Sequence, residues 1–180
     1  MKNIIDEFKS AKCFIYTCNS GYLDPSHWTQ DIAIGGGRLL GEACHFVDLL
    51  RFLAGASITH ISKVEVENKN NVSDSFSISI KFEDGSIGTI NYFSNGHRSY
   101  PKETLKVFVG GKIIELDNYR NLKTWGIKGF KNIIKFTQDK GHKNCVKAFL
   151  DAIKNGKESP IPLEEIFEVQ EKLLELVEKK

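Results

Sequence analysis

The hydrophobic and polar positions of this chain follow two different periods. Between Gly36 and Ala54 apolar residues recur every three or four positions, at Leu39, Ala43, Phe46, Leu50 and Leu53. This spacing puts them on one stripe of a helix, and Gly55 stands where helices often end in a left-handed residue. We therefore expect a long helix over 36–54.

From Ser57 to Leu116 the period changes to two. The alternation is clearest over 75–83, where the apolar positions are Phe76, Ile78, Ile80 and Phe82. Such alternation predicts strands with one buried face and one polar face. Asp84-Gly85 and Gly110-Gly111 separate runs of this kind and are typical of tight hairpins, so the predicted sheet is largely antiparallel.

Shorter segments complete the predicted order of elements. Residues 4–11 have helical spacing, residues 13–18 are rich in strand formers, and residues 19–34 are predicted to form a loop. Residues 117–138 show no regular pattern. Helical spacing returns over 146–153 and stops at Asn155-Gly156, and a last helix is predicted after Pro162.

The last helix is predicted to turn six apolar residues toward the core, namely Leu163, Ile166, Phe167, Leu173, Leu174 and Val177. The whole order predicts an α+β fold with a largely antiparallel open sheet and helices packed on one face. The other face, with Ser75, Ser77 and Ser79, is then available for oligomerisation or for contact with water.

Composition fits a single domain over residues 1–180. The 180 residues are 41% hydrophobic and 27% charged, as in ordinary globular domains, and this excludes disordered and fibrous classes. A net charge of +2 gives no field that attracts nucleic acid or an anionic membrane. No apolar run is long enough for a membrane span. The first residues include Asp6 and Glu7 where a signal peptide has a long apolar core, so a cytoplasmic location is expected.

No metal site and no disulfide are expected. The four cysteines, Cys13, Cys18, Cys44 and Cys145, form no C-x-x-C pair. The histidines lack H-x-x-H spacing, and a site built from them would need distant loops to converge.

The residues of most chemical interest begin at Gly35-Gly36-Gly37. Glycines let a backbone approach a ligand closely, and the free N–H groups at a helix start suit an anion. At about 100° per residue, Arg38, Glu42 and His45 fall within a sector of about 60°. An imidazole one turn from a carboxylate has the parts of a general acid/base pair. The spacing alone favours a simple surface pair of Glu42 and His45, worth a few tenths of a kcal/mol.

Three further features have both a functional and a structural explanation. The basic run from Arg120 to Lys147, which includes Lys140, is either a solvated face or, with Arg38, a site for the phosphates of a nucleotide-linked sugar. Trp28 either stacks on a sugar ring or caps the core. His97, at a predicted strand end, either meets substrate or lies in an exposed loop.

The string from Gly35 to Asp48, Gly-Gly-Gly-Arg-Leu-Leu-Gly-Glu-Ala-Cys-His-Phe-Val-Asp, resembles the second-domain motif of the Gfo/Idh/MocA oxidoreductases. More narrowly it is similar to their bi-domain oxidoreductase and sugar dehydrogenase branch. Weaker fragments follow in the same order, from Asn19-Ser20-Gly21 through Lys102-Glu103 and Asp139-Lys140-Gly141-His142 to Pro160-Ile161-Pro162. The resemblance therefore runs from about Cys13 to the C-terminus.

The resemblance implies that His45 moves the proton of a substrate hydroxyl and that Asp48 supports it. The family's usual aspartate four residues before this histidine is Gly41 here, which leaves open whether Glu42 replaces it. The candidate catalytic residues are thus His45, Asp48 and Glu42. The candidate substrate-binding residues are Arg38, Gly36, Gly37, Trp28, His97 and Lys140.

The cofactor part of such an enzyme is missing from this sequence. The family holds NAD or NADP on an N-terminal Rossmann domain with a G-x-G-x-x-G turn, and no such spacing occurs here. We therefore expect no cofactor-binding residues on this chain and no turnover by it alone. The resemblance also implies a homo-oligomer through the sheet face. The alternative is a non-catalytic ligand-binding or oligomerisation module that retains the fold.

Overall fold

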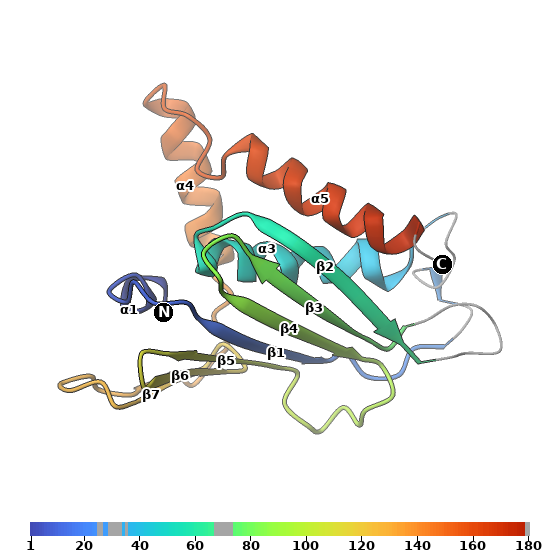
Figure 1. Cartoon of the computed structure of the whole chain (residues 1–180), viewed down its shortest axis with the longest axis horizontal. Helices are drawn as coiled ribbons and strands as arrows, with labels where there is room; N and C mark the ends of the chain where they lie inside the picture. Colours follow the sequence, from blue (N-terminus) through green and yellow to red (C-terminus); the bar gives the residue numbers. More distant parts are fainter. Residues whose placement is uncertain (25–26, 29–33, 35, 67–73, 179–180) are drawn as a thin grey trace.

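A single open sheet carries helices on one face (Figure 1). The computed structural model describes residues 1–24, 27–28, 34, 36–66 and 74–178. In these residues the sheet order is β2-β3-β4-β1-β5-β6-β7-β8. The strands are β1 (Cys13–Asn19), β2 (Ile58–Glu65), β3 (Phe76–Phe82), β4 (Ile87–Phe93), β5 (Glu103–Val109), β6 (Lys112–Asp117), β7 (Asn121–Trp125) and β8 (Ile133–Ile134). The helices are α1 (Lys2–Ile5), η2 (Leu39–Ala43), α3 (Cys44–Ala54), α4 (His142–Lys154) and α5 (Leu163–Glu178).

The sheet confirms the predicted α+β fold and adds one parallel pair. Strand β1 lies between β4 and β5, parallel to β4 and antiparallel to β5. The remaining neighbours are antiparallel, and the predicted turns at Gly85 and Gly110-Gly111 join β3 to β4 and β5 to β6. Because β1 and β4 run the same way, both strands end at the same edge of the sheet.

The predicted helix over 36–54 forms with an irregular first part. Residues Leu39–Ala43 make a π-helical turn, η2, and α3 continues as a regular α-helix to Ala54. Gly55 ends it in the left-handed conformation with φ 70°. A π turn widens the helix locally, so residues on its two sides lose the fixed 100° relation that the sequence argument assumed.

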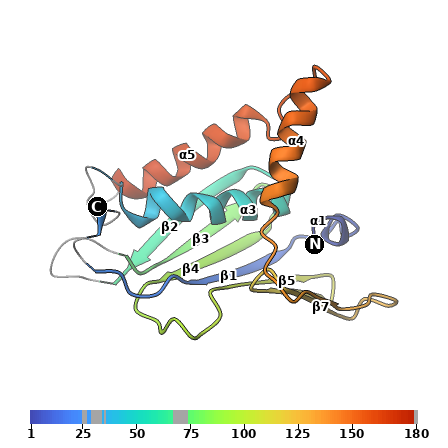
Figure 2. The ribbon, with the colours of Figure 1, turned by 180° about the vertical axis from the view of Figure 1, so that it is seen from behind.

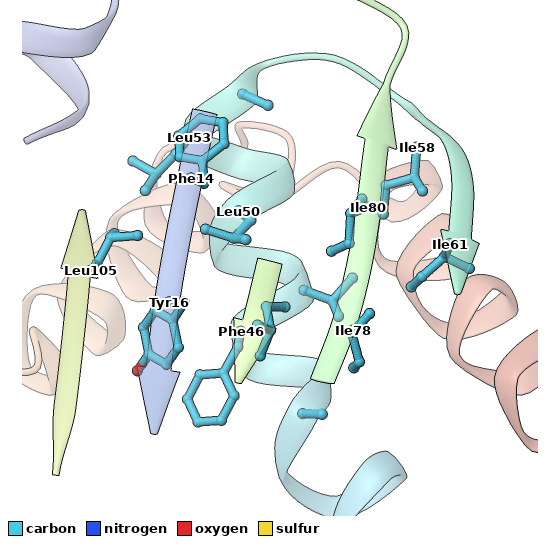
Figure 3. Packing of buried hydrophobic residues seen from close by; sticks show 14 of the residues in the cluster. Phe14, Tyr16, Phe46, Leu50, Leu53, Ile58, Ile61, Ile78, Ile80 and Leu105 are labelled. Carbon is cyan, nitrogen blue, oxygen red and sulfur yellow. The ribbon is translucent and has the colours of Figure 1, made fainter. Parts of the chain in front are cut away.

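The core lies between α3 and the sheet (Figure 3). Phe46 and Leu50 of α3 meet Phe14 and Tyr16 of β1, and the rings of Tyr16 and Phe46 stack at 4.5 Å. Gly88 of β4 permits this close approach, because a Cβ built there would lie 2.9 Å from Cδ1 of Leu50.

Helix α5 lies beside α3 on the same face of the sheet (Figure 2), but the prediction of its core-facing residues was largely wrong. Leu173 is buried, and so are Val169 and Leu176, which the prediction left out. The other five predicted residues, Leu163, Ile166, Phe167, Leu174 and Val177, are exposed. The apolar face of α5 is wider than the surface that α3 and β2 cover, so periodicity alone did not show which part would be buried.

An ion-pair cluster fastens α5 to α3. Arg51 of α3 contacts Glu165 at 2.7 Å and Glu168 at 3.2 Å. Glu168 also accepts a hydrogen bond from the backbone N–H of Ile58 at the start of β2, at 2.5 Å. The carboxylate of Glu168 therefore links α3, through Arg51, to Ile58, the first residue of β2.

The stretch 117–138 is more regular than expected. It contains β7, which pairs with β6, and the short β8, which pairs with β7. In β7 only Leu122 is buried, so the alternation that marks a strand is too weak to detect in the sequence. None of the described helices is long and apolar enough to span a bilayer.

Candidate functional site

The carboxyl ends of β1 and β4 bring two loops together at one edge of the sheet. Asn19 at the end of β1 donates a hydrogen bond from Nδ2 to the carbonyl of His97 at 2.9 Å. The N–H of Ser20 donates to the carbonyl of Phe93 at the end of β4, also at 2.9 Å. Arg98 donates from Nη2 to the carbonyl of Tyr22 at 2.9 Å. These contacts fix the loop before the glycine run against the loop that carries His97.

A buried charged cluster lies beneath this edge. Arg38 is only 4% exposed, and its Nη1 pairs with Oε1 of Glu42 and donates to the hydroxyl of Tyr92 at 2.8 Å. The hydroxyl of Tyr92 in turn donates to Oε2 of Glu42 at 2.7 Å. Burial raises the pKa of Tyr92, so its hydroxyl stays protonated and remains a donor.

Two donors of Arg38 take no part in this cluster. Its Nε and Nη2 are buried and have no hydrogen-bond partner among the described residues. The guanidinium carbon also lies 5.9 Å from the centre of the Tyr92 ring. A buried guanidinium with unpaired N–H groups is suited to binding an anion or the hydroxyl groups of a sugar, because leaving buried donors unpaired costs free energy.

His45 and Asp48 lie one turn apart near the start of α3. The imidazole of His45 is exposed, whereas Asp48 is half-buried. Burial raises the pKa of Asp48, the charge of Glu165 adds to this, and His45 and Arg51 act in the opposite direction. Asp48 thus lies in the electrostatic field of both the exposed imidazole and the α5 ion-pair cluster.

The predicted grouping of Arg38, Glu42 and His45 on one side of a helix is only half confirmed. Arg38 and Glu42 do meet, but Arg38 is buried against the sheet while His45 faces solvent. The π turn of η2 lies between Arg38 and His45 and is the physical reason, because it changes the rotation per residue.

The glycines before the helix adopt the conformation that glycine favours. Gly36 and Gly37 have φ values of 66° and 75°, which are strained for any residue with a side chain. A Cβ at Gly37 would have open space around it, so the need here is conformational. Gly35 lies outside the described residues.

Trp28 and His97 belong to the two loops that the edge contacts hold together. Trp28 is exposed, and its ring lies 5.9 Å from that of His27. The Nδ1 of His97 lies 2.8 Å from the Ser99 hydroxyl and accepts a hydrogen bond from the Ser99 N–H at 3.2 Å. The loop of His97 is therefore fixed at the edge through Asn19, and no contact places the exposed Trp28 ring there.

Lys140 reaches the same edge from the segment before α4. Its Nζ pairs with Oε1 of Glu103 at 3.0 Å and lies 5.6 Å from the centre of the Tyr119 ring. Glu103 is 4% exposed and lies opposite Cys18 of β1. Burial, with a further contribution from Glu103, raises the pKa of Cys18 to about 12, so this thiol stays neutral. Lys135 of the basic run is also paired, with Asp139 at 2.6 Å.

Sequence reasoning did not find Tyr92 or Glu103. Each faces the buried side of its strand, where an alternating pattern predicts an apolar residue. A tyrosine hydroxyl or a carboxylate at such a position needs a partner, and that is the signal that could have identified both.

Comparison with known proteins gives a consistent result. A family model described as the GFO/IDH/MocA C-terminal domain matches residues 4–112. No curated protein sequence matches the chain.

Solved structures match over nearly the whole chain. A dehydrogenase from Clostridium difficile superposes with a TM-score of 0.79 at 17% identity, over 99% of this chain and 58% of that one. UDP-N-acetylglucosamine 3-dehydrogenase from Acidithiobacillus ferrooxidans gives 0.75 at 14% identity, over 97% and 55%. Levoglucosan dehydrogenase in complex with NADH gives 0.77 at 18%, over 97% and 59%. At these identities the likeness shows the fold, and the chain spans little more than half of each of these proteins.

Proposed function

This chain belongs to the GFO/IDH/MocA family, whose C-terminal domain it matches, and from that premise we propose that it is the substrate-binding and assembly domain of an NAD(P)-dependent oxidoreductase. Its substrate is a sugar or a sugar nucleotide, and the domain does not turn over by itself. The observation that carries the proposal is the exposed imidazole of His45, one helical turn from the half-buried Asp48.

In this proposal His45 exchanges the proton of a substrate hydroxyl. A neutral imidazole accepts that proton when the alcohol is oxidised and returns it when the carbonyl is reduced. Asp48 stabilises the imidazolium that forms, since a carboxylate one turn away favours the charged ring. Glu42 acts indirectly, because both of its oxygens are already bound by Arg38 and Tyr92.

The residues of this chain do not fit a nicotinamide dinucleotide. No G-x-G-x-x-G turn occurs in the sequence, and the paired glycines at 110–111 form the β5–β6 hairpin. The cofactor, which supplies or accepts hydride when bound, is therefore assigned to another domain. This chain contributes the proton transfer and binds the substrate.

Substrate contact is proposed for the edge formed by the ends of β1 and β4. Arg38 offers Nε and Nη2 to a phosphate or to sugar hydroxyls, and the backbone at Gly36 and Gly37 allows close approach. His97, whose loop is held at this edge, binds sugar hydroxyls in this proposal, and the exposed Trp28 ring stacks on the sugar. Lys140 contributes a donor from its pair with Glu103.

The class of substrate is supported by the matched structures. One of them is a UDP-N-acetylglucosamine dehydrogenase and another a levoglucosan dehydrogenase bound to NADH. We extend from these proteins only the class, a sugar or its nucleotide derivative, and the use of NAD or NADP. A cytoplasmic location belongs to the same proposal, and all four cysteines are free thiols as that compartment requires.

The uncovered sheet face is proposed to pair with a second copy of the chain. Its strand register aligns side chains in rows, one of which runs through Ser79, Thr89, Ile15, Lys106 and Glu115. A neighbouring row contains the exposed apolar residues Ile87, Phe108 and Trp125. Flat faces that mix apolar and small polar groups in this way are suited to subunit contact.

One feature favours a second candidate, a non-catalytic ligand-binding or oligomerisation module. Gly41 stands where the resemblance leads us to expect an aspartate, and Glu42 is held by Arg38 and Tyr92. Such a module would bind the sugar at the same edge, and His45 would contribute nothing to a reaction.

The proposed function is tested by NADH formation with UDP-N-acetylglucosamine. The isolated chain is expected to show none, and the chain combined with the dinucleotide-binding polypeptide of its natural locus is expected to turn over. Turnover by the isolated chain at about 1 per second, an ordinary enzyme rate, contradicts the proposal. A combination that binds the sugar but never turns over favours the second candidate.

A further inference from the structure

The guanidinium of Arg38 is bound on one side. Its Nη1 pairs with Oε1 of Glu42 and donates to the Tyr92 hydroxyl at 2.8 Å. The two nitrogens that have no partner among the described residues, Nε and Nη2, form another side of the same planar group. Their N–H bonds point the same way, so together they can donate to two neighbouring oxygen atoms of one ligand. The unpaired side of Arg38 is therefore the side that makes bidentate hydrogen bonds.

The charge of Arg38 is already balanced by Glu42. The second oxygen of Glu42, Oε2, accepts a hydrogen bond from the Tyr92 hydroxyl at 2.7 Å. Arg38 is 4% exposed, and the ring of Tyr92 lies 5.1 Å from that of Phe76 and 6.2 Å from that of Phe46. Charges are screened weakly in such apolar surroundings, so adding a second anion beside Glu42 costs free energy. The unpaired side of Arg38 thus offers two donors without an unbalanced charge.

Arg51 shows the contrasting case nearer the surface. It contacts two carboxylates, Glu165 and Glu168, whose side chains are 25% and 19% exposed, so water screens their repulsion. Even there, the charge of Glu165 adds to the burial that raises the pKa of Asp48. A second carboxylate at the almost fully buried Arg38 would be screened less and would be repelled more strongly.

A second buried pair at the same end of β1 has the same balance. Lys140 pairs with Oε1 of Glu103 at 3.0 Å, while Oε2 of Glu103 is buried and has no partner among the described residues. The pKa of the Cys18 thiol, raised mainly by burial, is raised further by Glu103 and by Glu42, so this residue of β1 lies within electrostatic reach of both carboxylates. Unpaired donors on Arg38 and an unpaired acceptor on Glu103 match hydroxyl groups, which donate and accept, whereas an ionised carboxylate only accepts.

We propose that Glu42 determines specificity, by making Arg38 select a neutral sugar ring over an anionic group. The inference rests on the proposed function and specifies which part of the substrate Arg38 binds. That part is two neighbouring oxygens of the uncharged ring, and any phosphate of a sugar nucleotide lies outside this position. The proposal also gives Glu42 a role that does not involve His45.

Binding of glucose and glucuronate to the whole chain tests this role. The two sugars share a ring and differ in one group, a hydroxymethyl in glucose and a carboxylate in glucuronate. The NMR signal of the Arg38 Nε–H reports binding at this position. The wild type is expected to bind glucose at least about tenfold more tightly than glucuronate, because Glu42 repels the carboxylate.

Glu42→Gln provides the matched change, since it keeps the shape of the side chain and removes its charge. The variant should bind glucuronate more tightly than glucose, because the charge of Arg38 is then unbalanced. Glu171→Gln, which changes an exposed carboxylate of α5, is the control and should keep the wild-type order. A folded Glu42→Gln chain that still prefers glucose overturns the proposal.

Salt separates this position from exposed cations. Arg98 and Lys102 are exposed, so attraction of glucuronate to either of them weakens as salt is added. The wild-type preference for glucose at Arg38 should therefore persist at high salt. This measurement decides the matter even if circular dichroism shows that Glu42→Gln does not fold. Glucuronate that shifts the wild-type Arg38 signal at the same concentration as glucose, at high salt, overturns the proposal.

The same titrations separate this inference from the proposed function, when turnover is measured with the dinucleotide-binding polypeptide of the natural locus. Equal binding of the two sugars at Arg38, with turnover lost in His45→Asn, overturns the role of Glu42 and leaves the proposed function standing. An order that Glu42→Gln reverses, with turnover unchanged in His45→Asn, does the opposite. A chain in which neither sugar moves the Arg38 signal contradicts both.

Discussion

At the scale of single residues, the candidate chemistry combines one exposed imidazole with charges held below the surface. His45 meets solvent, while Arg38 and Glu42 neutralise each other against Tyr92. Two further donors of Arg38, Nε and Nη2, are buried and have no hydrogen-bond partner among the described residues. In the proposed function, proton transfer belongs to His45 and substrate positioning to Arg38.

The first prediction concerns His45. In the assembled enzyme, His45→Asn should lower kcat about 100-fold or more, because general acid/base catalysis contributes at least that much. The variant should unfold at the same urea concentration as the wild type, since the ring is exposed. His60→Asn, an exposed histidine on β2, is the control and should leave kcat unchanged. Equal activity of the His45 and His60 variants would remove His45 from the mechanism.

The second prediction follows from the raised pKa of Asp48. Because the folded chain binds this proton more tightly than the unfolded chain, the free energy of unfolding falls as pH rises from the ordinary value of 3.8 through the raised pKa. The Asp48→Asn variant has no carboxyl group at this position, so its free energy of unfolding should not show this fall with rising pH. Urea unfolding at several pH values should show the variant gaining stability relative to the wild type across that window and keeping the gain at neutral pH. A gain that instead shrinks with rising pH would mean that the pKa of Asp48 is lowered.

Single residues also show where sequence reasoning reaches its limit. Arg38, Glu42 and His45 were found from their spacing, since i, i+3 and i, i+4 pairs are visible in any helix, whereas Asp48 was found from the family resemblance. Tyr92 was missed because its partner lies 50 residues away in the sequence. A polar residue at a buried strand position shows that a partner is needed, but the sequence around it does not show which residue that partner is.

At the scale of elements, the α3 and α5 pair depends on Arg51, Glu165 and Glu168. This cluster holds α5 over the helix that bears His45 and fixes the start of β2 through Ile58. Helix α5 therefore supports the candidate site without contributing a residue to the substrate edge.

The third prediction tests this attachment. Glu168→Ala leaves the N–H of Ile58 without its acceptor and removes one partner of Arg51, so the free energy of unfolding should fall by about 1–3 kcal/mol. Glu171→Ala on the same helix changes an exposed carboxylate and should cost less than about 0.5 kcal/mol. Denaturant unfolding of the two variants makes the comparison. Equal free energies of unfolding would mean that the ion-pair cluster does not stabilise the fold in solution.

Elements with a strong local pattern were predicted well. The α3 stripe, the β3 alternation and the two glycine hairpins each have a period or a turn residue that fixes them. The parallel pairing of β1 with β4 was not predicted, because it depends on how the sheet is ordered in space. The exposed stripe of α5 was assigned to the core because a hydrophobic pattern does not say which partner will cover it.

At the scale of the whole molecule, the fold presents two apolar surfaces on opposite sides. The strand side carries Ile15, Ile87 and Phe108, and the helix side carries exposed apolar residues of α4 and α5, among them Phe149 and Phe167. The first is proposed for self-association. The edge at the ends of β1 and β4 is the proposed place of substrate contact.

The fourth prediction concerns the strand side. The chain should scatter light as a dimer or larger species at micromolar concentration, and Ile15→Glu should make it monomeric, because a charge at the centre of the sheet face cannot be desolvated there. Lys9→Glu, in an exposed position outside the helices and strands, should leave the mass unchanged. A monomeric wild type would mean that the sheet face is in contact with solvent and does not mediate self-association.

The most direct test of the account follows the His45 ring by NMR while ligands are added to the chain by itself. UDP-N-acetylglucosamine and glucose are added first, and NADH is added to a separate sample. A sugar ligand is predicted to move the His45 ring signals together with the amides of Gly36, Gly37 and Arg38, while NADH leaves them in place. Signals that respond to NADH alone, or to none of the three at millimolar concentration, would contradict a substrate domain that receives its cofactor from elsewhere.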